Sequence, residues 1–178
     1  SIGLENVGMN PTRIGVLEVL FSMEANIRIE NERTEGGEPV ADIVAESSDL
    51  IATEISGDII PRVVDELPVL SLAACFARGT TTIANAEELR VKESDRISAT
   101  VQSLQKLGGK IEETHDGMKI SGNGRLTGAT VESFGDHRIA MTNAIAGLIA
   151  QGETLIDEAE SASVSYPDFW DTIEDIRS

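Results

Sequence analysis

Two helical segments with almost no polar side chains constrain the fold more than any other feature of this chain. Leu67–Phe76 and Ile139–Ala150 contain no Asp, Glu, Lys or Arg. A helix that is apolar on every side has to be buried on every side. Asp65 and Asp136 precede the two segments and lie 71 residues apart. The sequence therefore predicts a repeated unit with a buried helix at its centre.

Strand-like segments recur at nearly the same interval. Gly79–Ile83 and Gly152–Ile156 each follow one of the buried helices, and they begin 73 residues apart. Short segments with alternating or β-branched apolar residues indicate further strands at Ala25–Ile29, Lys110–Glu112, Met118–Ile120 and Ala129–Val131. We predict an α/β (α+β) fold in which copies of a strand–helix–strand–helix–strand unit pack around the buried helices.

Helix starts and turns complete this outline. Capping residues or first-turn prolines predict that helices begin at Asn10-Pro11, Ser94-Asp95 and Ser165–Pro167. We expect the glycine-rich segment Glu35–Pro39 to be an exposed loop and Ile2–Gly8 to be the end of a preceding copy of the unit. No segment is long enough to link two domains, so residues 1–178 are predicted to form a single domain. The partial copy at the N-terminus further suggests that the sequence is part of a longer protein.

The charge balance limits what the chain can bind. It has 31 acidic and 14 basic side chains, for a formal net charge of −17, and such a surface repels nucleic acids and anionic membranes. No apolar stretch approaches the roughly 20 residues of a membrane span. We therefore expect a soluble, cytoplasmic protein without nucleic-acid or membrane partners. The single cysteine, Cys75, lies in an apolar segment and is predicted to be buried and unreactive.

Basic residues are concentrated at two predicted helix starts. Arg90–Arg96 holds three cations and two carboxylates, and Gly135–Arg138 opens another helix. Helix N-termini offer unpaired N–H groups and partial positive charge, which suit phosphate and carboxylate ligands. These clusters predict a positive pocket for an anionic substrate within a negative surface. The alternative is structural: Asp65, Asp95 and Asp136 are then only helix caps, and the basic residues only form surface pairs.

Six motifs resemble the C-terminal half of the 5-enolpyruvylshikimate-3-phosphate synthases, in the order in which that family carries them. They are Val7–Arg13, Gly57–Pro61, Val64–Pro68, Arg90–Ile97, Gly135–Met141 and Ser165–Phe169. The resemblance implies the enolpyruvyl transferase fold, a two-domain protein whose domains are built from repeated βαβαββ units around buried parallel helices. It also implies that this chain is the C-terminal domain of such a protein and that the N-terminal half is absent.

An activity follows from the same resemblance. The family's enzymes transfer the enolpyruvyl group of phosphoenolpyruvate to the 5-hydroxyl of shikimate 3-phosphate and release phosphate, a step of chorismate and aromatic amino acid biosynthesis. The attacking hydroxyl must lose a proton, and the family's base matches Asp65. The methylene carbon of phosphoenolpyruvate must gain a proton, a role that matches Glu93. No metal or cofactor is implied.

Four further residues match binding positions of the family. The arginines that bind phosphoenolpyruvate match Arg96 and Arg138, and a lysine that contacts shikimate 3-phosphate matches Lys92. His137 flanks the site, where a neutral histidine can serve either in a supporting hydrogen bond, which we favour, or in proton transfer. The implied partners are the two small-molecule substrates and the missing N-terminal domain of the same enzyme.

The chain departs from the family pattern in two ways. A lysine that some members carry near the C-terminus falls here at about Val164. The family's Lys-Ser, Gly-Asn-x-Gly-Thr and Ser-Ser-Gln motifs, which supply most contacts to shikimate 3-phosphate, have no counterpart in the sequence. We therefore expect half of an active site, inactive alone. The alternatives are an isolated anion-binding module, a related enolpyruvyl transferase of cell-wall synthesis, and a purely structural α/β domain.

Overall fold

The computed structural model describes residues 1–177, and the middle of the chain forms one complete six-element unit. Its four-stranded sheet has the order β4-β5-β7-β6. β4 and β5 are parallel, whereas β7 pairs antiparallel with both β5 and β6. The elements are β4 (Glu54–Ile55), α3 (Leu67–Phe76), β5 (Thr80–Ile83), α4 (Arg96–Lys106), β6 (Lys110–Thr114) and β7 (Gly117–Ser121). This βαβαββ order confirms the predicted repeat.

The N-terminal section repeats the second half of that unit. Its sheet has the order β1-β3-β2 with both pairs antiparallel, like β5-β7-β6. The elements are β1 (Ile2–Gly8), α1 (Gly15–Ser22), β2 (Asn26–Glu35) and β3 (Glu38–Glu46). Short helical turns then lead toward α3 and α4: η1 (Gly57–Ile59), α2 (Ile60–Val63) and η2 (Glu87–Val91). β1 therefore corresponds to β5, in the middle of a copy, and the prediction that Ile2–Gly8 ends a preceding copy was wrong, because β1 pairs with β3 of the same section.

The C-terminal section repeats the first half of the unit instead. β8 and β9 pair in parallel, as β4 and β5 do, with one helix between them and another after them. The elements are β8 (Thr130–Glu132), α5 (His137–Ile149), β9 (Leu155–Asp157), η3 (Ala159–Val164) and α6 (Phe169–Arg177). The described chain thus holds one complete unit between two partial ones.

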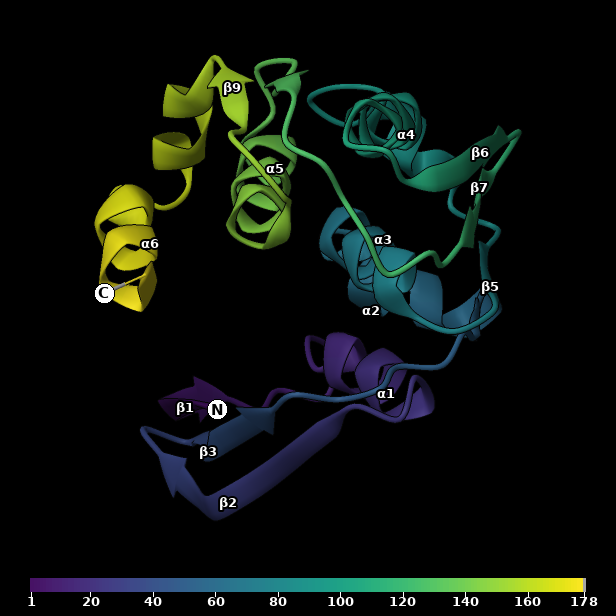
Figure 1. Ribbon diagram of the computed structural model, residues 1–178. Coiled ribbons are helices and arrows are strands. Elements are labelled where there is room, and N and C mark those ends of the chain that lie inside the picture. Colours follow the sequence, from purple (N-terminus) through teal and green to yellow (C-terminus); the bar gives the residue numbers. More distant parts are fainter. Residues whose placement is uncertain (178) are drawn as a thin grey trace.

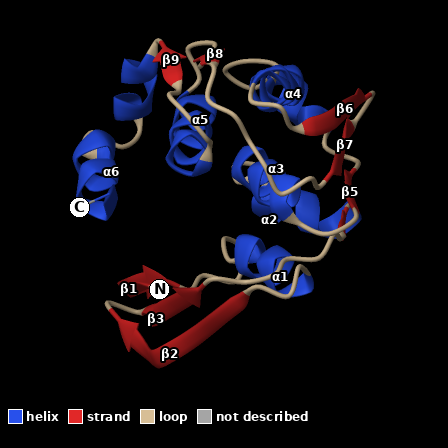
Figure 2. Cartoon of the chain, in the orientation of Figure 1, coloured by secondary structure: helices blue, strands red, loops and turns tan. Residues whose placement is uncertain are grey.

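The three units lie along an arc. Figure 1 shows the β1–β3 sheet at one end of the arc, β9 and α6 at the other, and α3 between them. Helices α3 and α5 lie toward the inside of the arc, and β5–β7 and β8–β9 lie on its outside (Figure 2). α3 packs against α4, α5 and β7. Cys75 on α3 is buried as predicted, and burial raises the pKa of its thiol to about 11.

The N-terminal hairpin is longer and tighter than the sequence indicated. The strand expected to end at Ile29 continues to Glu35, because it pairs with β3, a strand that the sequence prediction missed. The loop expected at 35–39 is reduced to a two-residue turn, in which Gly36 and Gly37 have φ angles of 60° and 92°. Positive φ at both turn positions matches the twist of the strands and favours glycine.

Two helices begin later than predicted. α1 starts at Gly15, because Asn10 instead closes a turn in which its side-chain oxygen accepts from the backbone N–H of Thr12 at 3.0 Å. α6 starts at Phe169 rather than at 165–167, after the 3₁₀ turn η3. At the second place the backbone N–H groups of Tyr166 and Phe169 donate to Ala162 and Tyr166, so a turn precedes the helix.

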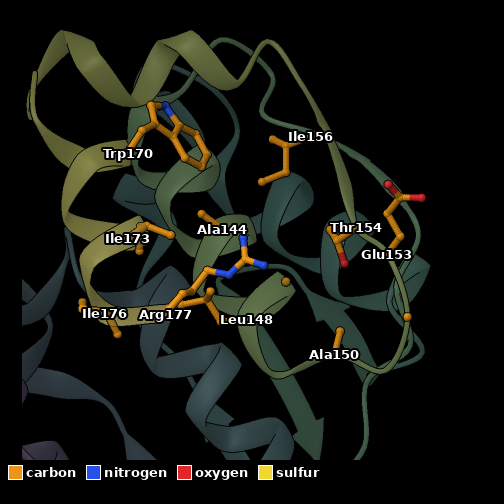
Figure 3. A pocket seen from close by; sticks show the side chains of 12 residues that line it. Ala144, Leu148, Ala150, Glu153, Thr154, Ile156, Trp170, Ile173, Ile176 and Arg177 are labelled. Carbon is orange, nitrogen blue, oxygen red and sulfur yellow. The ribbon is translucent and has the colours of Figure 1, made fainter.

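α5 is less completely buried than its apolar sequence predicted. Ala140 and Ala146 are fully buried, but Ile149 is 49% exposed. The open side of α5 borders a cavity of about 770 Å³ between α5, β9 and α6, shown in Figure 3. Its apolar lining comprises Ala144, Leu148, Ala150, Ile156, Trp170, Ile173 and Ile176.

The contact between the end of β7 and α3 yields a stability prediction. A Cβ atom on Gly122 would overlap the carbonyl oxygen of Ala77. We expect Gly122→Ala to lower the free energy of unfolding by about 1–3 kcal/mol, the usual cost of overpacking, as measured by urea denaturation. Gly8→Ala is the control, because its Cβ would meet nothing within 4 Å. Equal stabilities of the two variants would contradict this account of the packing.

Candidate active site

The starts of α3, α4 and α5 meet in one cluster of charged side chains. Asp65 lies just before α3, Arg96 is the first residue of α4, and Asp136 is the N-cap of α5. The three helices pack against one another, so side chains from their first turns come within hydrogen-bond distance. The structure thereby brings together the motifs that the sequence singled out at separate helix starts.

Arg96 lies at the centre of this cluster, and each of its three nitrogens donates to a different carboxylate. Nε donates to Asp136 at 2.8 Å, Nη1 to Asp65 at 3.1 Å, and Nη2 to Glu93 at 2.6 Å. The side chain of Arg96 is 2% exposed, whereas those of Asp65 and Glu93 are 26% and 53% exposed. A buried guanidinium therefore holds two carboxylates that reach the surface.

Asp136 is the buried counterpart of Arg96 and is completely inaccessible. It also accepts from the Ser94 hydroxyl at 3.0 Å and from the backbone N–H of Arg138 at 2.8 Å. Burial alone would raise the pKa of Asp136, but the hydrogen bonds from Arg96, Arg138 and Ser94 outweigh it and hold this pKa below its ordinary value. Asp136 thus caps α5, as the structural alternative allowed, and also joins α5 to α4.

Asp65 differs from the other two aspartates, because it is not a helix cap. The N-cap of α3 is the next residue, which makes no side-chain capping bond. Asp65 instead accepts from Arg96 and, at 3.4 Å, from Nη2 of Arg138. The capping alternative is therefore wrong for Asp65. It is correct for Asp95, which accepts from the backbone N–H of Ser98 at 3.0 Å.

Two members of the cluster, Arg13 and Glu66, were missed as candidates in the sequence. Nη2 of Arg13 lies 3.8 Å from Glu66 Oε1, and Nη1 lies 4.0 Å from Asp65 Oδ2. Burial raises the pKa of Glu66, with a further rise from Asp65, while the charges of Arg13 and Arg138 oppose the shift. Arg13 ended one of the recognised motifs, which was the only signal available for it.

The other predicted site cations are less central. Nζ of Lys92 pairs with Glu88 at 2.6 Å, and Arg90 donates to backbone carbonyls near the β6–β7 turn. His137 is half-buried at the start of α5 and makes no hydrogen bond with its side chain among residues 1–177. Carboxylates pair with the guanidiniums of the cluster, and the positive pocket for an anionic substrate stays a prediction.

The cavity of Figure 3 is separate from this cluster, since none of its lining residues belongs to the charged network. Within residues 1–177, no three His, Cys, Asp or Glu side chains are grouped so that they could hold a metal ion. In the same residues, no helix has the length and apolar character needed to cross a membrane.

Comparison with known proteins links nearly the whole chain to one family. Residues 1–173 match the family model described as EPSP synthase (3-phosphoshikimate 1-carboxyvinyltransferase). The 3-phosphoshikimate 1-carboxyvinyltransferase of Synechococcus elongatus is 57% identical over 173 residues, which are 97% of this chain and 39% of that protein. The corresponding protein of Herpetosiphon aurantiacus is 54% identical over 171 residues, 96% of this chain and 40% of its own.

Solved structures agree with these sequence relatives. An EPSP synthase from Acinetobacter baumannii superposes with a TM-score of 0.90 and 43% identity, covering 94% of this chain and 39% of that one. The enolpyruvyl transferase NikO from Streptomyces tendae has a TM-score of 0.73 and 17% identity, covering 97% of this chain and 38% of its own, a likeness of fold alone. The chain spans about 40% of the length of the curated relatives it matches.

The Arg96–Asp136 pair yields a second stability prediction. Asp136→Ala leaves a buried guanidinium without its main partner, so we expect the free energy of unfolding at pH 7 to fall by about 3–5 kcal/mol. Glu88→Ala, which removes the exposed partner of Lys92, should cost about 0–1 kcal/mol. Urea denaturation of both variants and the parent chain measures the difference, and equal costs would contradict the central place given to Asp136.

The same pair should carry a pH dependence. The folded-state pKa of Asp136 is lowered, so its ionised form stabilises the fold above the unfolded pKa of about 3.9. This contribution is lost as the pH falls through the lower folded value. The stability gap between the parent chain and Asp136→Ala should therefore narrow below about pH 4.

Proposed function

The chain belongs to the EPSP synthase family, and we propose that it is the C-terminal domain of a cytoplasmic enolpyruvyl transferase. The whole enzyme moves the enolpyruvyl group of phosphoenolpyruvate to the 5-hydroxyl of shikimate 3-phosphate and releases phosphate. The named relatives do not favour the alternative of a cell-wall enolpyruvyl transferase. The partners of the chain are then these two substrates and the N-terminal domain of the same enzyme.

The observation that carries this proposal is that one buried guanidinium holds two carboxylates at the surface. The reaction requires a base that takes the hydroxyl proton and an acid that protonates the methylene carbon. Asp65 serves as the base and Glu93 as the acid. Because both are hydrogen-bonded to Arg96, they are fixed relative to each other. A pair of groups that acts on two bound substrates has to be held in this way.

The cations of the cluster serve the anionic groups of the substrates. Arg138 is 29% exposed and donates to Asp65 only at 3.4 Å, so it has hydrogen-bonding capacity for phosphoenolpyruvate. The buried Arg96 adds positive charge that attracts phosphoenolpyruvate. Among residues 1–177, the side chain of Lys92 pairs with the exposed Glu88 alone, and a contact with shikimate 3-phosphate can replace this pair. His137 supports the site by donating a hydrogen bond to an anionic group of a bound substrate.

The topology supports the proposal that another part of the enzyme completes this domain. Within residues 1–177, β1 lacks the parallel neighbour that β4 provides for β5. β9 lacks the antiparallel neighbour that β7 provides for β5. Leu4 on β1 and Leu155 on β9 are 51% and 55% exposed. In the proposed enzyme, further segments cover these edges, and the N-terminal domain supplies the remaining substrate contacts.

We predict that the chain alone has no measurable synthase activity. Most contacts to shikimate 3-phosphate are missing, and positioning of reactants can supply about 7–11 kcal/mol of barrier lowering. The assay is phosphate release from phosphoenolpyruvate in the presence of shikimate 3-phosphate. Turnover near that of a full-length relative would refute the proposal that the chain is half of a site.

In a full-length protein that carries this segment, Asp65→Asn should lower kcat by about 10²–10⁴-fold, the usual cost of losing a general base. KM for both substrates should change little, because the amide keeps the shape of the carboxylate. Asp95→Asn is the matched control, since Asn caps a helix as well as Asp does. An unchanged kcat in Asp65→Asn would exclude Asp65 as the base.

A further inference from the structure

A third arginine, Arg13, approaches the proposed base from a different unit of the fold. It lies in the loop between β1 and α1, and its side chain is 62% exposed. Its distances to Asp65 and Glu66, 4.0 and 3.8 Å, are too long for hydrogen bonds. Arg13 therefore attracts both carboxylates while its N–H groups have no acceptor among the described residues.

The backbone that carries Arg13 is held in place by its neighbours. The side-chain oxygen of Asn10 accepts from the backbone N–H and the hydroxyl of Thr12, at 3.0 and 2.8 Å. Arg62 on α2 donates to the carbonyl oxygen of Pro11 from Nε at 3.1 Å and from Nη2 at 2.9 Å. These hydrogen bonds hold the loop against α2, just before Asp65. Binding of an anion by Arg13 therefore carries no entropic cost for ordering the loop.

The start of α1 is fitted to α2 as well. A Cβ atom at Gly15 would lie 2.7 Å from Val63 Cγ1 and 2.8 Å from the carbonyl oxygen of Arg62. The two helices therefore approach each other as closely as glycine allows. Since Arg13 lies two residues before this contact, its position relative to Asp65 follows from packing between two units.

Arg138 meets Arg13 at the same carboxylate oxygen. Nη2 of Arg138 lies 3.4 Å from Asp65 Oδ2, the atom that Arg13 also approaches. Nε of Arg138 is buried and has no hydrogen-bond partner within residues 1–177. Arg96, by contrast, uses all three of its nitrogens on carboxylates. Among the described residues that pair with Asp65, Arg13 and Arg138 are therefore the two that are not fully engaged with carboxylates.

We propose that Arg13 and Arg138 together form a binding site for a phosphate group beside Asp65. Two guanidinium groups provide the planar pairs of donors that phosphate oxygens accept. Arg13 is exposed and can turn from Glu66 toward the incoming anion, while Arg138 is held by the first turn of α5. Insofar as the phosphate belongs to a substrate, this site rests on the proposed function. It adds to that function a residue from the N-terminal unit.

The test is a titration of this chain with inorganic phosphate and, separately, with phosphoenolpyruvate, at an ionic strength kept constant with chloride. The side-chain ¹⁵Nε–¹H resonances of the arginines report binding. Arg13 and Arg138 should shift and saturate with one Kd. Arg13→Gln should raise this Kd about tenfold, whereas Arg125→Gln, an exposed arginine between β7 and β8, should leave it within about twofold.

A second variant should change the Kd for phosphate in the opposite direction. Glu66→Gln removes the carboxylate that competes for Arg13, so the Kd for phosphate should fall about threefold. Melting temperatures of all variants show whether the fold is kept. Equal Kd values in Arg13→Gln and Arg125→Gln, or no saturable shift in the parent chain, would overturn the proposal. If a full-length protein lacks turnover while this chain binds phosphate through Arg13, the proposed activity is wrong and the site stands.

Discussion

The buried ion pair between Arg96 and Asp136 is the contact on which the charged cluster depends. It joins α4 of the complete unit to α5 of the C-terminal unit, and neither side chain is more than 2% exposed. Removing two charges from water is costly, and their mutual attraction alone does not reliably offset it. Here Asp65, Glu93, Ser94 and the backbone N–H of Arg138 add the missing hydrogen bonds. The geometry of the site is therefore inseparable from the packing of the helices.

The cluster has a rigid interior and an adjustable rim. Charges that are buried and hydrogen-bonded interact strongly, because little water screens them, whereas exposed pairs contribute about 0–1 kcal/mol. Arg96 and Asp136 form the interior. Arg13 and Lys92 form the rim, where their contacts with Glu66 and with the exposed Glu88 can be exchanged at small cost. Such a division suits the proposed site, which has to bind anions on a chain of net charge −17 although carboxylates pair with its guanidiniums.

The sequence predicted those parts of the fold that depend on local pattern. The bounds of α3 were predicted correctly because apolar residues on every side leave one environment for that helix. β3 was missed because Glu38–Glu46 has no clear alternation, and it becomes a strand by pairing with both β1 and β2. The roles of Asp65 and Asp136 could not be separated, because an aspartate near a helix N-terminus can either cap the helix or form an ion pair with an arginine. Glu93 lies only three residues before Arg96, but Asp65 and Asp136 lie 31 and 40 residues away, where no spacing rule reveals them.

The contrast between α3 and α5 shows what the described chain lacks. Both helices have apolar sequences and the same place in the repeat, but only α3 is followed by a complete set of strands. α5 packs against α3 and α4 on one side and borders the 770 Å³ cavity on the other. Each Å² of apolar surface that stays in water loses about 25 cal/mol of stabilisation. The apolar sequence of α5 is therefore suited to complete burial, but the described chain buries this helix only in part. The proposed remainder of the enzyme therefore has a structural task as well as a catalytic one: to cover the open side of the helix whose first turn holds His137 and Arg138.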